Sequence, residues 1–208
     1  DHNKALELDL LASEIFKSNY GKDHTSYARS LNSIAHSYSW LGEYNKALEL
    51  NQVALKIIGK NEGKEHPLYV YILSNVAQNH FILGDYNKSL EINSLALTLR
   101  EKTLGKEHTD YAESLENVAI NYFKLGYYHK ALNFNLLALD IRGNVFGKEH
   151  PSYGQSLNNI GMSYKNMGDH KKALKALKEA NLILKKCLGT DHHNYSTNLF
   201  NIAFMYSK

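Results

Sequence analysis

Apolar residues recur along the chain at helical spacing, in stripes that return every 42 residues. One stripe consists of Leu73, Val76, Ala77, His80 and Leu83, and a second consists of Tyr86, Leu90, Ala96, Leu97 and Leu99. Offsets of 3, 4, 7 and 10 in the first stripe place its members on one face of an α-helix. Each period is therefore predicted to contain two antiparallel helices, and the whole chain is predicted to be all-α.

Glycines punctuate the helical stripes with the same period. They stand at Gly42, Gly84, Gly126 and Gly168, and at Gly21, Gly63, Gly105, Gly147 and Gly189. A glycine just after a helix readily takes the left-handed conformation that ends it, so we expect a turn at each position. Pro67 and Pro151 suit the first turn of the following helix. In the same column, Thr25 and Thr109 are expected to cap helix starts.

The register predicts ten helices in a single continuous array over residues 1–208. The array comprises an orphan second helix (1–20), four full repeats (21–62, 63–104, 105–146 and 147–188) and a terminal first helix (189–208). Neither end reads as a polar capping repeat, so we expect the natural array to extend further.

The order Leu-x-x-(Ile/Val)-Ala-x-x-Tyr-x-x-Leu-Gly-x-Tyr-x-x-Ala-Leu resembles the tetratricopeptide repeat (TPR). The 42-residue form, ending in the stretch 99–108, is similar to the repeats of kinesin light chain and nephrocystin-3. This resemblance implies a right-handed α-solenoid of antiparallel helix pairs. Gly59 and Gly143 depart from the pattern, because glycine late in a helix weakens it by about 1 kcal/mol. We expect those two helices to end early or bend.

The composition bears on the partner, the cellular compartment and membrane insertion. The net charge is +3 with both signs intermixed, which favours neither a nucleic acid nor a membrane as partner. The single cysteine, Cys187, forms no internal disulfide, so a reducing compartment, the cytoplasm, is expected. No apolar run approaches the roughly 18 residues that span a bilayer, and the polar opening stretch is not that of a signal peptide.

A column of histidines is the feature most suggestive of metal binding. It consists of His24, His66, His108, His150 and His192. Stacked repeats hold equivalent positions about 8–10 Å apart, too far for ligands to converge on one ion. We expect each ring to cap a helix end or to pack on the neighbouring tyrosine, such as Tyr27 or Tyr153. No metal or cofactor site is predicted.

Catalytic motifs are also missing from the sequence. It has no phosphate-binding glycine loop, no nucleophile elbow and no Cys-x-x-Cys. Cys187 is interpreted as a partly buried, inert thiol. The protein is therefore not expected to be an enzyme.

Asparagines form two further columns. In the second helices Asn51, Asn93 and Asn135 are expected to face the next repeat, where buried amides need hydrogen-bond partners. A structural role that fixes repeat stacking is favoured for them over contact with a ligand. In the first helices the row Asn75, Asn117, Asn159 and Asn201 is the candidate binding element. An amide donates and accepts, so such a row can hold the backbone of an extended peptide. The alternative is that these asparagines only bond one another or water.

By resemblance, first helices line the concave face of a TPR array, where a ligand binds. The candidate groove residues besides the amide row are Arg29, Asn158, Phe123, Met162 and Lys165, and Ile120 and Phe204 add apolar surface. Kinesin light chain, by resemblance, takes acidic, tryptophan-containing peptides there. Here Glu113 and Glu116 offset the nearby cations, so a strongly acidic ligand is not favoured.

The predicted function is that of a scaffold that binds a peptide or protein partner on its concave face. The alternative is a sensor or regulatory arm of a larger multidomain enzyme or nucleotide-dependent switch protein. A third reading is self-association through exposed solenoid ends.

Overall fold

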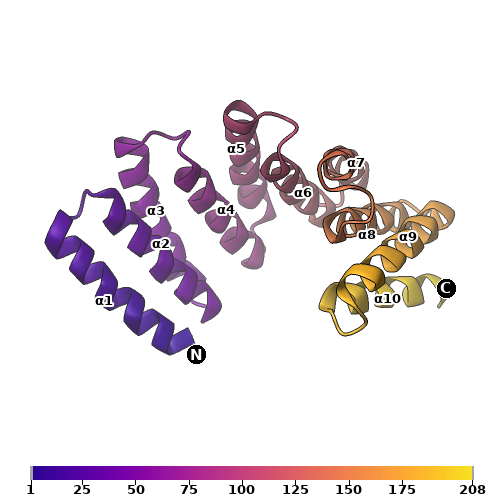
Figure 1. The fold of residues 1–208 in the computed structure, drawn as a ribbon, viewed down its shortest axis with the longest axis horizontal. Helices are drawn as coiled ribbons and strands as arrows, with labels where there is room; N and C mark the ends of the chain where they lie inside the picture. The colour runs from indigo at the N-terminus through magenta and orange to yellow at the C-terminus, as the bar shows by residue number, and fades with distance from the viewer. Residues whose placement is uncertain (1, 208) are drawn as a thin grey trace. The chain divides into compact units, whose positions relative to one another are not determined.

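The protein is all-α in the computed structural model, which describes residues 2–207 (Figure 1). The helices are α1 (His2–Tyr20), α2 (Thr25–Trp40), α3 (Tyr44–Asn61), α4 (Pro67–Ile82), α5 (Tyr86–Leu104), α6 (Thr109–Lys124), α7 (Tyr128–Phe146), α8 (Pro151–Asn166), α9 (His170–Leu188) and α10 (His193–Tyr206). No β-strand occurs among the described residues, and the ten predicted helices are confirmed.

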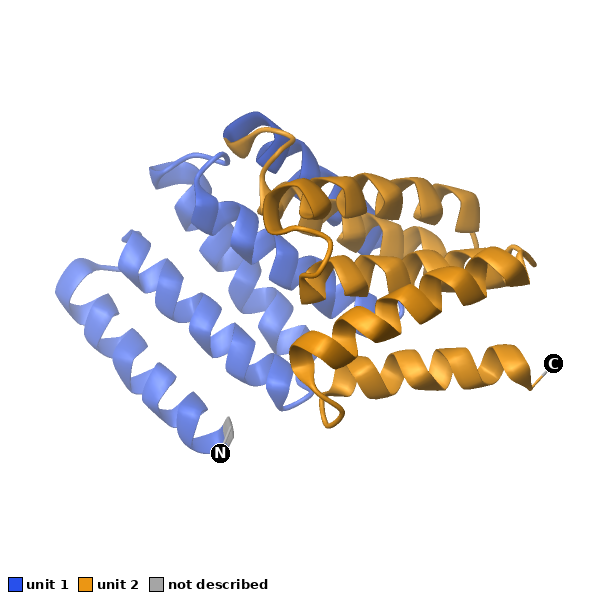
Figure 2. Ribbon diagram, turned by 45° about the vertical axis from the view of Figure 1, so that its right-hand side comes forward, with its two compact units in different colours: residues 1–103 blue, residues 104–208 orange. Residues whose placement is uncertain are grey.

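The helices group into two compact units, Asp1–Thr103 and Leu104–Lys208 (Figure 2). Within each unit, helices adjacent in sequence pack as antiparallel pairs, among them α2 with α3, α6 with α7, and α8 with α9. That the two units form one continuous array over residues 1–208 stays a prediction.

The predicted glycine turns are confirmed. Between α2 and α3, Gly42 has a φ of +81°, and the Glu43 N–H donates to the Tyr38 carbonyl at 2.9 Å. This bond closes the Schellman motif, which satisfies a carbonyl that the helix end leaves free. All nine predicted turn glycines have a positive φ, between 79° and 86°.

Histidine side chains cap the starts of all five first helices. His24 Nδ1 accepts a hydrogen bond from the Ser26 N–H at 3.1 Å, which satisfies one of the unpaired donors of α2. His66, His108, His150 and His192 cap α4, α6, α8 and α10 in the same way. The capping interpretation is therefore confirmed.

Two details of that interpretation are wrong. The aromatic partners lie in the preceding helices, where Tyr20 stacks on His24 at 4.8 Å between ring centroids and Phe146 stacks on His150 at 4.4 Å. Thr25 is not the cap but the first residue of α2, and its hydroxyl donates to Glu62 Oε1 at 2.8 Å. The histidine takes the cap because its Nδ1 reaches the second N–H of the helix.

Replacing His108 by Ala should lower the free energy of unfolding by about 0.5–2 kcal/mol, the usual cost of losing a side-chain cap. In the wild type the Asp110 N–H donates to His108 Nδ1 at 3.1 Å, and the variant lacks this acceptor. The matched variant His108→Asn keeps an acceptor at the cap and should stay within a few tenths of the wild type. Urea unfolding measures both variants, and equal losses in the two would contradict the capping role.

The first-helix stripes supply the core, as predicted. In the N-terminal unit Leu31, Ile58 and Leu73 belong to one buried cluster contributed by α2, α3 and α4. In the C-terminal unit Leu115 of α6 is 1% exposed, and Leu157 of α8 packs with Ala180 of α9. Since these stripes take one face of each first helix, the remaining positions are free to form a surface.

The expected early ends at Gly59 and Gly143 are not observed. Helix α3 continues to Asn61 and α7 to Phe146, so both glycines are helical. A Cβ added at Gly143 would lie 3.1 Å from Cε2 of Tyr153, and one at Gly59 would lie 3.2 Å from Cε2 of Tyr69. These glycines make room for buried tyrosine rings.

Gly161 and Leu177 form a matched pair between α8 and α9. A Cβ at Gly161 would lie 2.7 Å from Cγ of the fully buried Leu177. One column holds Ala35, Ala77 and Ala119 where this repeat has Gly161, and the other holds Asn51, Asn93 and Asn135 where it has Leu177. In this repeat the alanine of the first column is thus replaced by glycine, and the asparagine of the second column is replaced by leucine.

Candidate functional site

Three pockets occupy equivalent positions in different repeats. The N-terminal pocket lies among α2, α3 and α4, the apolar pocket among α6, α7 and α8, and the Lys165 pocket among α8, α9 and α10. Their volumes are about 350, 120 and 350 Å³ respectively. In each case two successive first helices form the walls, and the second helix between them contributes to the lining.

The lining residues follow the sequence repeat. Between the N-terminal and apolar pockets, the equivalent positions are His36 and Ile120, Ser39 and Phe123, Asn51 and Asn135, Asn75 and Asn159, and Gln78 and Met162. Between the N-terminal and Lys165 pockets, they are Ser39 and Lys165, Trp40 and Asn166, Tyr44 and His170, Gln78 and Phe204, and Asn79 and Met205. The fold therefore repeats one cavity with different side chains.

The apolar pocket brings together three of the predicted groove residues, Phe123, Met162 and Asn159. The Phe123 ring is held edge-on against Tyr128, with centroids 5.3 Å apart. Asn135 also lines the pocket, is 3% exposed, and has a buried Oδ1 without a hydrogen-bond partner among the described residues. The cavity thus has apolar walls and an unsatisfied amide.

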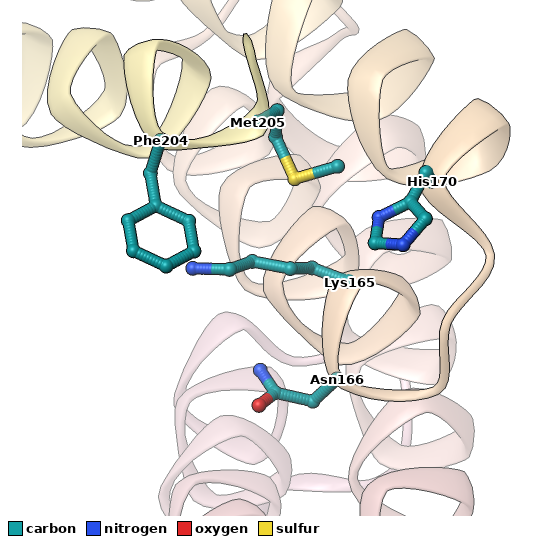
Figure 3. Close-up of a pocket in the computed structure, with 5 residues that line it drawn as sticks. All are labelled: Lys165, Asn166, His170, Phe204 and Met205. Carbon is teal, nitrogen blue, oxygen red and sulfur yellow. The ribbon is translucent and has the colours of Figure 1, made fainter. Parts of the chain in front are cut away.

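The Lys165 pocket has a different character (Figure 3). The Lys165 side chain extends toward the Phe204 ring, with Nζ 3.6 Å from the ring centroid, a cation–π contact. His170 and Met205 complete this part of the lining. Phe204, which is expected to add apolar surface, remains 37% exposed and also lies against the Lys165 cation.

The four asparagines of the amide row differ in their surroundings. Asn75 Nδ2 donates to Asn32 Oδ1 at 3.0 Å, and Asn201 Nδ2 donates to Asn158 Oδ1 at 3.1 Å. Among the described residues, Asn159 Oδ1 accepts a long bond of 3.5 Å from Gln155, and the side chain of Asn117 is half-buried in α6. The side chains of Asn117 and Asn159 are therefore held less closely by hydrogen bonds within the described part of the chain than those of Asn75 and Asn201.

The remaining predicted groove residues are Arg29 and Asn158. Arg29 is exposed on α2 and lines none of the three pockets. Asn158 is buried, and its Oδ1 accepts from both Asn198 and Asn201, so it joins α8 to α10.

The sequence matches a protein-family model over most of its length. The tetratricopeptide repeat model matches residues 1–60, 68–144 and 123–180. The chain belongs to the tetratricopeptide repeat family. Its repeats support a role as a protein-interaction scaffold in general, and TPR repeat proteins are typically not enzymes. No curated protein sequence matches the chain significantly.

Several solved TPR-type structures share the fold. The nearly identical TPR-like repeats of a Podosopora anserina protein of kinesin light chain type are 23% identical, with a TM-score of 0.77 over 91% of this chain and 90% of that one. BtubC (BKLC) from P. vanneervenii is 19% identical, with a TM-score of 0.83 over 99% of this chain and 83% of that one. The apo form of RapI is 19% identical, with a TM-score of 0.81 over 100% of this chain and 55% of that one. At these identities the likeness concerns the fold alone.

A buried ion pair inside the TPR array escaped sequence reasoning. Arg142 of α7 lies 2.7 Å from Glu116 of α6 and also donates to Ser156 Oγ of α8 at 2.9 Å. Ser156 Oγ in turn donates to Glu116 at 2.5 Å. Burial raises the pKa of Glu116, and the opposing effects of Arg142 and Ser156 are smaller. Glu116 is therefore a structural residue and does not offset groove cations, contrary to expectation.

No cluster of three or more potential metal ligands occurs among the residues that the structure describes. Cys187 is exposed rather than partly buried, and its thiol donates to the Glu149 carbonyl at 2.8 Å. Within the described part of the chain, no helix is both long and apolar enough to cross a membrane.

Two of the second-helix asparagines, interpreted from the sequence as structural residues rather than ligand contacts, line two of the pockets. Asn51 and Asn135 were expected to find partners at the next repeat, yet their Oδ1 atoms have none among the described residues. Both line pockets together with residues of the next first helix. The signal was present in the sequence, since a polar residue recurs in a column that is usually apolar in this family.

Proposed function

We propose that the chain binds an extended peptide segment of a partner protein across the pocketed, concave side of its first helices. The observation that carries the proposal is the recurrence of one cavity at equivalent positions of different repeats. Side chains of an extended peptide also recur at a regular interval, so a repeated cavity suits such a ligand. The cavities are already formed in the free chain, which lowers the ordering cost of binding.

Within this proposal the apolar pocket anchors one aliphatic or aromatic side chain of the peptide. Ile120, Phe123 and Met162 provide the apolar surface that such a side chain would bury. Asn117 and Asn159 hold the peptide backbone, because each amide can donate to a carbonyl and accept from an N–H. Asn158 and Asn201 already bond each other between α8 and α10, so their role in this proposal is to hold these two helices together rather than to contact the peptide.

Replacing Asn117 and Asn159 together by Ala should weaken peptide binding about five- to a hundred-fold. Each lost hydrogen bond costs roughly 0.5–1.5 kcal/mol. The probes are peptides selected on the wild-type chain from a randomised display library, with affinities measured by calorimetry or fluorescence anisotropy. Stability should change little, since both side chains are only half-buried.

The control for this experiment is Leu115→Ala. Leu115 is 1% exposed in the core of the C-terminal unit, so this variant should lose about 2–5 kcal/mol of stability. At temperatures where it stays folded, it should bind the same peptides with little change. If the double asparagine variant instead unfolds and its folded fraction binds normally, the row is structural and the binding surface lies elsewhere.

We further propose that the chain acts in the cytoplasm. Its one cysteine, Cys187, is free and exposed, which suits a reducing compartment better than an oxidising one. Locating a fluorescently tagged chain in cells of its source tests this placement.

A further inference from the structure

The N-terminal pocket is the richest in carboxamide side chains of the three repeated cavities. It is lined by His36, Ser39, Trp40, Tyr44, Asn51, Asn75, Gln78, Asn79 and Ile82. Four of these residues carry a carboxamide, and none carries an Asp, Glu, Lys or Arg side chain. The equivalent positions of the apolar pocket hold Ile120 for His36 and Met162 for Gln78, so this chemistry is particular to one repeat.

Two lining amides are buried without full hydrogen bonding. Asn51 is 1% exposed and Asn79 is 2% exposed, yet Oδ1 of Asn51 and Nδ2 of Asn79 have no partner among the described residues. A buried polar atom left unbonded costs free energy, which a ligand that bonds it would recover. Both residues line the N-terminal pocket, so their unbonded atoms are the candidate partners for a hydrogen-bonding group of a ligand.

The hydrogen bond of the Ser39 hydroxyl affects which side-chain atom of Asn79 is available to a ligand. Ser39 Oγ lies 3.0 Å from the Ala35 carbonyl and 2.9 Å from Asn79 Oδ1, but its single proton can be donated to only one of them. A half-turn of the Asn79 amide exchanges its oxygen and nitrogen, so the atom presented by Asn79 is either a donor or an acceptor. A ligand group that both donates and accepts satisfies the pair of amides in either arrangement.

We propose that the N-terminal pocket receives the carboxamide side chain of a glutamine or asparagine in the bound peptide. This inference rests on the proposed peptide-binding function and specifies one side chain of the ligand. A carboxamide has two donor hydrogens and an acceptor oxygen, which match unpaired atoms of Asn51 and Asn79. An ionised side chain would lose its hydration in a lining without a counter-charge, which is costly.

The rest of the lining fits the same group. Trp40 and Tyr44 supply aromatic surface against which the methylene groups of a glutamine side chain can pack. A hydroxyl side chain would fill little of a cavity of about 350 Å³ and offers only one donor hydrogen. An aliphatic side chain would leave the amides of Asn51 and Asn79 unbonded.

The test uses propionamide and propionate, which reproduce the ends of the glutamine and glutamate side chains. Titration of the full chain is followed through the side-chain amide signals of Asn51 and Asn79 in nitrogen-15 NMR spectra. Propionamide should shift these signals saturably, and propionate should bind at least tenfold more weakly. Equal affinity for the two compounds, or no saturable shift with propionamide, overturns the assignment.

A matched variant removes the Asn51 amide while keeping the packing. Ala35→Gly together with Asn51→Leu reproduces the pair that Gly161 and Leu177 form in a later repeat. Propionamide, followed at the Asn79 signals, should bind this variant at least tenfold more weakly than the wild type. Unchanged affinity in a folded variant also overturns the assignment.

The two levels of the proposal fail separately. If selected peptides bind at Asn117 and Asn159 but propionamide does not bind the N-terminal pocket, only the carboxamide assignment is wrong. If propionamide binds as expected but no peptide is captured, the peptide-binding function is wrong. The pocket then recognises a carboxamide on a ligand of another kind.

Discussion

Replacing Arg142 by Ala should lower the free energy of unfolding by about 3–5 kcal/mol, the usual effect of removing one partner from a buried ion pair. The side chains of Arg142 and Glu116 are only 11% and 10% exposed, so water cannot replace the lost interaction. The substitution also removes the hydrogen bonds that the Arg142 guanidinium donates to Ser156 Oγ and to the Ser152 carbonyl. Urea unfolding followed by circular dichroism measures the change.

A triple variant separates the cost of a lone charge from the value of the network. Glu116→Leu, Arg142→Met and Ser156→Ala together replace all three polar groups by apolar ones of comparable shape. Such replacements are often neutral or stabilising, so the triple variant should be much more stable than Arg142→Ala. A loss below about 1 kcal/mol in Arg142→Ala would show that the pair lies in an environment as well solvated as the surface.

The same site should give the stability a dependence on pH. Burial raises the pKa of Glu116 above its ordinary value of 4.5, so the folded chain holds this proton more tightly than the unfolded chain. The contribution is fully present below pH 4.5 and is lost as the pH rises through the folded-state pKa. Glu116→Gln removes this titration. The stability difference between wild type and variant should therefore shift against the wild type from pH 4.5 to pH 8, and a shift in its favour would reverse the inferred direction.

Gly161 and Leu177 should show strong energetic coupling. Leu177→Ala should cost about 2–5 kcal/mol, because Leu177 is fully buried and its truncation leaves a cavity. Gly161→Ala should cost about 1–3 kcal/mol from overpacking, since the new Cβ would lie 2.7 Å from Leu177 Cγ. The usual gain of about 1 kcal/mol from replacing a helical glycine offsets only part of that cost when the cost lies above the lower end of the range.

The double variant Gly161→Ala/Leu177→Asn tests the coupling directly. It recreates the alanine and asparagine of Ala35 and Asn51, so it should lose less stability than the sum of Gly161→Ala and Leu177→Asn measured singly. Urea unfolding of the four proteins completes the cycle. Agreement with the sum within about 0.5 kcal/mol would mean that the two positions adapt independently.

The fold was predictable because its determinants are local and repeated. Gly21, Gly42 and their equivalents mark the nine turns, and the stripe containing Leu73 identifies the buried face of each first helix. Gly59 and Gly143 were misread because a glycine in isolation signals a weak helix. Each of these glycines is explained by a tyrosine of the following helix, Tyr69 or Tyr153, whose ring packs where a Cβ atom would lie.

The site was predictable in part. The apolar pocket collects Phe123 and Met162 because they lie on the unburied side of neighbouring first helices, a relation that the period reveals. The pair of Glu116 and Arg142 was missed because it depends on side-chain direction between α6 and α7. Spacing along the chain carries no such information.

The construction of the pockets has a consequence for how such a chain can evolve. Most residues that line the cavities lie outside the buried stripe of the first helices, so substitutions at those positions change the chemistry of a cavity with little effect on the packing that supports it. Duplication of one 42-residue repeat would add the two helices that one further cavity of this kind requires. Under the proposed function, duplication would lengthen the peptide segment that is bound, and point substitutions would change which of its side chains are accepted, with neither process disturbing the other.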